Sequence, residues 1–278
     1  MIFDPRSVFL IASVIALATT PQVAAQSEGS GALRRYPIFG ETYEDVTLRD
    51  QKLHGTVFYI VSGHGGPDSG ARGERDGVTL CEDEYAYDIG LRLTRRLLEH
   101  DAKVYVIVRD PDDGIRDDSL LICDSDEIVW GDEEIPLGHL DRLKQRSDII
   151  NRLARANRYA RYQRIIELHI DSRQEGDRVD VFFYHHSVSP ASRRTALILQ
   201  STIEKKYRAN QPWRGYKGTV ASRDGLYMLR MTRPRAVYIE LGNIQNPLDQ
   251  RRFISVDNRQ ALANWLCEGL LEDFRRSR

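Results

Sequence analysis

The sequence has little net charge, few cysteines and no internal repeat. In its 278 residues, 40 Lys and Arg side chains nearly balance 41 Asp and Glu side chains, which leaves a formal net charge of −1 at pH 7. This balance argues against nucleic-acid binding and against membrane-surface binding by bulk electrostatics. Without repeats, a chain of this length is expected to form one medium-sized globular domain with a substantial core.

A short apolar stretch near the N-terminus indicates targeting. This stretch, at 8–18, follows Arg6 and precedes small residues at Val23 and Ala25. It is too short to span a bilayer, so the pattern is typical of a secretory signal peptide that is cleaved after Ala25. No cysteine follows the small residues, which argues against a lipoprotein anchor. We therefore expect a signal peptide at 1–25 and a periplasmic or secreted protein without stable membrane insertion; an uncleaved anchor is the alternative.

The chain has three cysteines, so at most one intrachain disulfide can form. Cys267 lies in a helical pattern with Leu262 and Leu266, which predicts a buried free thiol. Cys81 and Cys123 are then the expected disulfide pair, because an exported protein can retain such a bond.

Beyond residue 25 the composition divides the chain into a leader and one long domain. Residues 26–52 are polar and mixed, and we expect them to form an N-terminal leader, whereas 53–278 carries the pattern of a folded domain. An acidic stretch at 112–138 interrupts this pattern with ten Asp and Glu residues and one basic residue, Arg116. Insertions of this length are usually functional or disordered. We expect this insertion to border the binding groove and to tune access to it; a merely solvated loop is the alternative.

Apolar strands alternate with helical patterns along the domain. The expected strands are 56–62, 103–108, 164–170, 179–184 and 236–241. The expected helices are 84–100, 140–162, 191–207 and 260–275. In the first helix, Ile89, Leu93 and Leu97 form one apolar stripe. This alternation predicts a single α/β domain whose twisted, mostly parallel or mixed sheet carries helices on both faces.

Ionisable side chains stand at the ends of several expected elements. His64 follows the first strand, and Glu82 stands at the start of the first helix. His169 and Glu240 lie at the ends of two later strands. Because ligands collect at the carboxyl ends of strands in open α/β sheets, we expect these groups to face one site.

This combination of side chains suits hydrolysis assisted by zinc. Two imidazoles and one carboxylate bind zinc and leave a fourth position for water, which zinc makes more acidic. His64, Glu82 and His169 fit these ligand roles. A further carboxylate is needed to carry the proton of water to the leaving nitrogen, and Glu240 fits that role.

Alternatives remain for the metal ligands, because the sequence has no compact H-E-x-x-H motif. Glu84 competes with Glu82, since either carboxylate can face a metal from the start of a helix. His185 and His186 are also adjacent imidazoles. Neighbouring strand residues face opposite sides of a sheet, so these two cannot serve one metal, and we interpret them as surface or groove residues.

Short motifs occur in a fixed order between residues 55 and 274. Along the chain they are His64-Gly65-Gly66 with Asp68, Gly70 and Ala71; Glu82-Asp83-Glu84 with Asp88-Ile89 and Leu91-Arg92-Leu93; Leu143-Lys144-Gln145-Arg146 with Ile150-Asn151 and Ala154; Leu168-His169-Ile170-Asp171; and Leu229-Arg230, Pro234, Ala236-Val237 and Glu240-Leu241-Gly242 with Asn246-Pro247. Together these motifs resemble those of the zinc-dependent N-acetylmuramoyl-L-alanine amidases of the amidase-3 type, which are bacterial cell-wall enzymes.

The resemblance implies a zinc ion held by His64, Glu82 and His169, and it favours Glu82 over Glu84 as the ligand. It implies that Glu240 is the catalytic carboxylate of a mixed α/β fold. The implied reaction is hydrolysis of the amide bond between N-acetylmuramic acid and L-alanine in peptidoglycan. A zinc peptidase or carboxypeptidase acting on exported or wall peptides is the alternative enzyme, and a muropeptide-binding module without turnover is the non-enzymatic alternative.

The sequence also departs from the pattern of that family. Val61-Ser62 replaces the Asp-Pro that precedes the first glycine of the family pattern, here Gly63. Ala86 replaces an Asn in the first helix, and Asn243 stands where the family has Phe. None of these changes removes an expected ligand. The changes at Ala86 and Asn243 are expected to alter the substrate groove.

Overall fold

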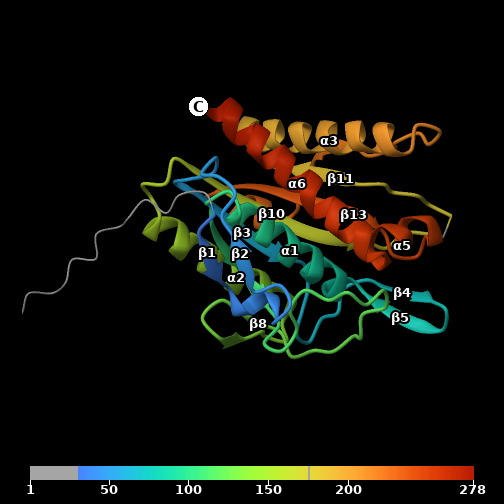
Figure 1. Cartoon of the computed structure of the whole chain (residues 1–278). Helices are drawn as coiled ribbons and strands as arrows, with labels where there is room; N and C mark the ends of the chain where they lie inside the picture. Colours follow the sequence, from blue (N-terminus) through green and yellow to red (C-terminus); the bar gives the residue numbers. More distant parts are fainter. Residues whose placement is uncertain (1–30, 175) are drawn as a thin grey trace, which may run out of the picture.

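A six-stranded mixed sheet runs through the centre of the computed structural model, which describes residues 31–174 and 176–278 (Figure 1). The strand order is β12-β11-β13-β10-β3-β6. Their bounds are β3 Thr56–Ser62, β6 Lys103–Val106, β10 Tyr162–Asp171, β11 Phe182–His185, β12 Val220–Ser222 and β13 Arg235–Asn243. β13, β10, β3 and β6 are parallel to one another, whereas β11 is antiparallel to β13. All seven residues of β3 are buried, as expected for a parallel strand covered on both faces.

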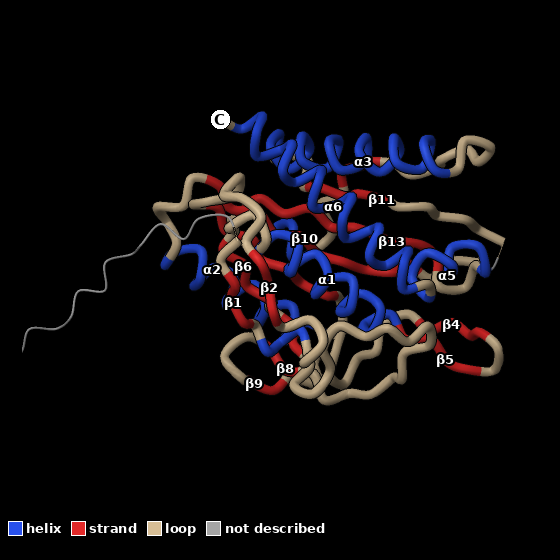
Figure 2. Tube along the Cα trace, viewed as in Figure 1, coloured by secondary structure: helices blue, strands red, loops and turns tan. Residues whose placement is uncertain are grey.

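Helices cover both faces of this sheet (Figures 1 and 2). Their bounds are α1 Glu82–Leu98, α2 His139–Ala156, α3 Pro190–Asn210, α4 Tyr227–Met231, α5 Pro247–Ile254 and α6 Val256–Ser277. The apolar stripe of α1, with α3, α5 and α6, packs on the side chains of one face, such as Ile60 and Leu168. Ile150 of α2 and Met228 of α4 pack on the other face, against Tyr59. The predicted α/β fold with a mixed sheet between helices is therefore confirmed.

Short strands form small sheets around the main one. β1 Leu33–Arg35 pairs with β2 Asp45–Thr47, and β4 Arg72–Arg75 pairs with β5 Val78–Cys81. β8 Ile128–Val129 lies between β7 Val108–Arg109 and β9 Glu133–Glu134. A 3₁₀ turn spans Pro37–Phe39.

The part of the expected leader that the structure describes packs against α1. Phe39 and Val46 are buried in one apolar cluster with Leu91 and Leu98, so these residues add to the core. The signal peptide expected at 1–25 lies outside the described residues. Among the helices of the described part, none is long and apolar enough to cross a membrane.

Some element boundaries differ from the sequence prediction. The helix expected at 140–162 ends at Ala156, because Tyr162 begins β10 and pairs with Thr56 of β3. Pairing with a central strand thus outweighs the helical propensity of the intervening residues. The strand expected at 179–184 begins only at Phe182.

The cysteines adopt the expected states. Cys81 and Cys123 form a disulfide with their Cα atoms 5.7 Å apart, and Cys267 is a buried free thiol. The disulfide joins the residue before α1 to the middle of the acidic insertion, so it fixes the insertion to the start of that helix.

Candidate metal centre and active site

Strand ends and one helix start meet at the carboxyl edge of the main sheet. β3 ends at Ser62 and leads into the turn that carries His64, whose φ of +63° is uncommon for a residue other than glycine. His169 lies near the end of β10, Glu240 lies in β13, and Glu82 is the first residue of α1. The fold therefore brings to one edge the groups that the sequence places far apart.

His64, Glu82 and His169 face one another across a short distance. His64 Nε2 lies 3.3 Å from Glu82 Oε2, and His169 Nδ1 lies 2.8 Å from Glu82 Oε1. One nitrogen or oxygen atom from each of the three residues lies within 4.8 Å of the others. The backbone N–H groups of Ala71 and Ile170 donate to the two Glu82 oxygens over 2.7 and 2.9 Å. The carboxylate is thus fixed between the two imidazoles.

Glycines make this approach possible. A Cβ atom at Gly70 would lie 2.5 Å from Glu82 Oε2 and 2.7 Å from ring carbons of His64, and the φ of Gly70 is +69°. A Cβ atom at Gly63 would collide with the His169 ring. Any larger residue at Gly63 or Gly70 would therefore push the side chains of the centre apart.

Further carboxylates orient the two histidines. His64 Nδ1 lies 3.0 Å from Asp68 Oδ2, and Arg142 donates to the same oxygen over 2.8 Å. His169 Nε2 lies 3.4 Å from Glu167 Oε1. A carboxylate on one imidazole nitrogen leaves the other nitrogen directed at a metal, and such pairs are common around metal-binding histidines.

Negative charge dominates the electrostatics of this centre. Burial raises the pKa of Glu82, but His169 and His64 outweigh burial and keep this pKa below its ordinary value. Burial lowers the pKa of His169, but the hydrogen bonds to Glu167 and Glu82 outweigh burial and raise this pKa to about 10. The carboxylates thus attract positive charge to the space between the imidazoles.

Glu240 lies beside this group without belonging to it. It is directly opposite His169 in the pairing of β13 with β10, and its side chain is buried. Its Oε2 atom has no hydrogen-bond partner among the described residues. Burial raises the pKa of Glu240 to about 8; His169 opposes this change, whereas Glu82 adds to it. Glu240 is therefore a carboxyl group that can hold or release a proton near neutral pH.

A cavity of about 330 Å³ opens beside His64 and His169. Its lining includes Leu140 and Leu143 of α2, Tyr227 of α4, and Tyr238 of β13. The Tyr238 ring stacks on the His169 ring, with centroids 4.2 Å apart. The cavity thus combines apolar and aromatic side chains with ionisable groups, as ligand pockets do.

Sequence reasoning missed Glu167, Tyr238, Arg142 and Arg146. Glu167 and Tyr238 stand two residues before His169 and Glu240, so the two-residue period of a strand places each on the same face as its partner. That period could have identified them. Arg142 and Arg146 lie on α2 and line the cavity. Arg146 belongs to one of the motifs quoted above, whereas Arg142 carries no comparable signal, because most arginines on helices are solvent-exposed.

The alternative ligands are not brought to this centre. Glu84 Oε2 accepts from Arg116 over 2.8 Å, and Glu84 Oε1 accepts from the Asp124 backbone N–H over 3.0 Å. His185 and His186 belong to none of the ligand clusters found among the described residues. Only the His64, Glu82 and His169 cluster of the described residues combines imidazole with carboxylate.

The acidic insertion contacts the turn that carries His64. Glu127 Oε2 accepts from the Gly66 backbone N–H over 2.6 Å, and Ile135 packs against Gly66. None of the described residues that line the cavity belongs to the insertion at 112–138. The insertion therefore contributes to this site by supporting the turn.

Comparisons with known proteins agree with the motifs and the fold. A family model described as N-acetylmuramoyl-L-alanine amidase matches residues 58–272. The probable cell wall amidase LytH of Staphylococcus aureus is 25% identical over 227 residues, which cover 81% of this chain and 61% of that relative. The chain thus spans less than two thirds of the length of this curated relative.

Solved structures of amidases share the fold at low sequence identity. The CwlD amidase from Clostridioides difficile, solved in complex with the GerS lipoprotein, matches with a TM-score of 0.60 and 16% identity over 79% of this chain and 98% of that chain. The amidase AmiC2 of Nostoc punctiforme matches with a TM-score of 0.56 and 20% identity over 80% of this chain and 98% of that chain.

The family match extends over most of the chain and includes every residue of the centre described above. It runs from β3, which precedes His64, through α1, β10 and β13 into α6. The resemblance inferred from the motifs is thereby confirmed, and the chain belongs to the N-acetylmuramoyl-L-alanine amidase family.

Proposed function

We propose that this chain is a zinc-dependent hydrolase that cleaves the amide bond between N-acetylmuramic acid and L-alanine in peptidoglycan. The observation that carries the proposal is the convergence of His64, Glu82 and His169 beside a cavity, with their ligand atoms within 4.8 Å of one another. Membership of the family supports the choice of bond and substrate.

The donor set of this centre fits zinc. Two imidazole nitrogens and one carboxylate oxygen form a set that zinc uses in hydrolases, because it leaves a coordination position free. His64 would bind through Nε2 and His169 through Nδ1, since Asp68 and Glu167 lie at the opposite nitrogens. When bound, zinc supplies Lewis acidity, which polarises a scissile carbonyl and makes water more acidic.

Glu240 is proposed to carry the proton. Its unpartnered Oε2 would accept a proton from the attacking water and then return it to the departing amine of L-alanine. Burial raises the pKa of Glu240 above its ordinary value, toward the range in which a carboxyl group can both accept and return a proton. The register of β13 with β10 holds this carboxyl group beside His169.

Three arginines of the described residues line the cavity, namely Arg142, Arg146 and Arg230, and they bear on the alternative of a carboxypeptidase. A carboxypeptidase needs a fixed cation that binds the terminal carboxylate of its peptide substrate. Arg142 is engaged by Asp68, and Arg146 donates to the His64 backbone oxygen. These two cations hold the His64 turn in place, whereas Arg230 is exposed and lies over the Tyr227 ring. The choice of the amidase reaction over a carboxypeptidase therefore rests on membership of the family.

We propose that the protein acts outside the cytoplasm. The apolar stretch at 8–18 and the small residues that end at Ala25 support an exported precursor. The disulfide between Cys81 and Cys123 supports an oxidising compartment. N-terminal sequencing of exported protein should begin near Gln26; recovery of an intact Met1 would contradict cleavage.

Digestion of purified sacculi tests the proposed activity. We expect free amino groups of L-alanine to appear at the start of the stem peptides and glycan strands to lose their peptides, which mass spectrometry can detect. New carboxyl termini inside or at the end of the stem peptide would indicate a peptidase. Binding to sacculi with no new termini would indicate a module without turnover.

A further inference from the structure

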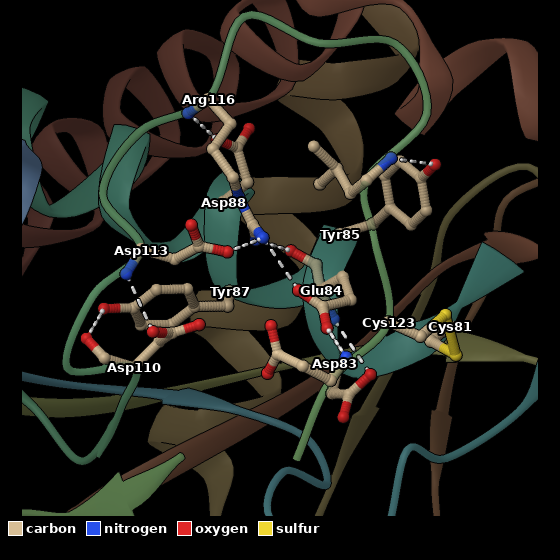
Figure 3. Close-up of polar contacts among 12 residues, drawn as sticks. Cys81, Asp83, Glu84, Tyr85, Tyr87, Asp88, Asp110, Asp113, Arg116 and Cys123 are labelled. Atoms are coloured by element: carbon tan, nitrogen blue, oxygen red, sulfur yellow. Dashed lines mark hydrogen bonds and ion pairs between the residues drawn. A yellow bond between two sulfur atoms is a disulfide. The ribbon is translucent and has the colours of Figure 1, made fainter. Parts of the chain in front are cut away.

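Carboxylates gather in a second group, outside the zinc centre proposed above. They come from the start of α1 and from the segment 110–127, and they form overlapping clusters. The members are Asp83, Glu84, Asp110, Asp112, Asp113, Asp124, Asp126 and Glu127. Figure 3 shows Asp83, Glu84, Asp110 and Asp113 from this group with Arg116 among them. Such crowding of like charges is unfavourable unless a proton or a cation intervenes.

Arg116 neutralises one side of this group. Its Nη1 atom donates to Glu84 Oε2 over 2.8 Å and also contacts Asp113. No ion pair to Asp110, Asp112 or Asp126 is found among the described residues, even though these three place one oxygen each within 4.8 Å of the others. The side of the group away from Arg116 therefore lacks a compensating cation from the described part of the protein.

Asp110 joins the two sides, because it shares one cluster with Glu84, Asp113 and Asp124 and another with Asp112 and Asp126. Asp110 is 5% exposed. Its Oδ1 atom accepts from the backbone N–H groups of Asp112 and Asp113 over 3.1 and 2.8 Å. Its Oδ2 atom is buried and has no hydrogen-bond partner in the part of the chain that the structure describes. A buried carboxylate oxygen without a donor is costly. One oxygen of the same carboxylate lies within 4.8 Å of an oxygen of Asp112 and of Asp126. The geometry thus presents an acceptor that needs a positive partner.

The pKa values agree with this geometry. Burial raises the pKa of Asp110 to about 7, and the charge of Asp113 adds to the effect of burial. Burial together with Asp124 and Asp112 raises the pKa of Asp126 to about 6. The raised pKa values mean that simultaneous ionisation of these carboxyl groups is unfavourable. A bound cation would lower both pKa values.

The segments that carry these oxygens are fixed to the core. The Cys81–Cys123 disulfide holds the second segment at the start of α1, and Glu84 Oε1 accepts from the Asp124 backbone N–H over 3.0 Å. The Tyr85 hydroxyl accepts from the Leu121 backbone N–H over 3.1 Å. The oxygens are therefore preorganised and do not have to be collected from a mobile loop when a ligand binds.

We propose that Asp110, Asp112 and Asp126 bind a Ca²⁺ ion at a site separate from the zinc centre. The donors are all oxygens, which favours a hard cation over zinc or copper. Ca²⁺ accepts irregular oxygen sets completed by water, whereas Mg²⁺ demands nearly ideal octahedral geometry. Through Glu127, which accepts from the Gly66 backbone N–H over 2.6 Å, the segment that bears Asp126 also supports the turn of His64.

Calcium titration of the zinc-loaded full chain, freed of calcium by a chelator column, tests this site. Sites of this kind in extracellular modules bind with Kd values of about 10⁻⁴–10⁻³ M. We expect one Ca²⁺ per chain by equilibrium dialysis and a rise in Tm of about 5 °C at 100-fold excess over Kd. Absence of both effects would overturn the proposal, and an equal response to Mg²⁺ at the same concentrations would overturn the choice of calcium.

Matched variants locate the ion. Asp110→Asn and Asp126→Asn should each weaken calcium binding at least tenfold, raise the Tm measured without calcium, and leave zinc content unchanged. Asp126 is exposed, so its substitution keeps the test valid if Asp110→Asn does not fold. Glu134→Gln, an exposed carboxylate of the same insertion outside the clusters, should bind calcium normally. Normal binding by Asp126→Asn would place the ion elsewhere and refute the assignment.

Discussion

His169 of β10 and Glu240 of β13 are direct partners in the parallel pairing of their strands. Because paired residues of adjacent strands project to the same face, this register holds a proposed metal ligand and a proposed proton carrier side by side. A shift of one residue in either strand would turn Glu240 toward the opposite face. The relative placement of the two groups therefore depends on the hydrogen bonds of the central sheet.

Glu240→Gln tests the role of this carboxyl group. Glutamine keeps the shape of the side chain but cannot accept a proton, so turnover of sacculi should fall by about 10²–10⁴-fold. Zinc content, measured in the same preparation, should be unchanged, because Glu240 lies outside the ligand cluster. An active variant would remove Glu240 from the mechanism, and an inactive variant without zinc would identify it as a ligand.

Glu82→Gln and Glu84→Gln form a matched pair that identifies the carboxylate ligand. Both residues are buried at the start of α1, but only Glu82 contacts His64 and His169. We expect Glu82→Gln to lose zinc affinity by about 10–100-fold or more, and Glu84→Gln to retain it. Metal analysis of dialysed protein distinguishes them. The reverse result would exchange the two assignments. His64→Ala and His169→Ala should each lose zinc.

Gly70→Ala tests whether the glycine turn shapes the metal centre. The new methyl group would lie 2.5 Å from Glu82 Oε2, so the carboxylate must move and zinc affinity should fall at least about tenfold. Gly77→Ala is the control, because Gly77 has a similar φ of +79° but no atom within 4 Å of the added methyl. Both variants carry backbone strain of about 1 kcal/mol. Equal zinc affinity in the two variants would show that contact at Gly70 is unimportant.

Cys81→Ser with Cys123→Ser tests the contribution of the disulfide. The bond closes a sequence separation of 42 residues, and its loss should lower the free energy of unfolding by about 2–4 kcal/mol. Urea unfolding of the zinc-loaded protein measures this difference, with the reduced wild-type protein as a second comparison. If the oxidised and doubly substituted proteins unfold at the same urea concentration, the bond does not stabilise the fold.

Local patterns were sufficient for much of the architecture. The apolar run of β3 and the stripe of Ile89, Leu93 and Leu97 in α1 arise from contacts that recur with the period of a strand or a helix, so these elements could be predicted. The elements that local patterns missed, such as β8 and α4, are short and are held by tertiary contacts. The helix predicted through Tyr162 ends early for the same reason, because pairing with β3 competes with local propensity.

The sequence by itself determined which groups are available: the motifs around His64, Glu82, His169 and Glu240 identified the family and named the candidate site. Only the tertiary structure decided which carboxylates share a location. Glu82 and Glu84 are separated by one residue, yet the first meets two imidazoles and the second meets Arg116. The register of the sheet, the glycine turns and the disulfide set these distances, because they join residues far apart in the chain, where no local pattern records the contact.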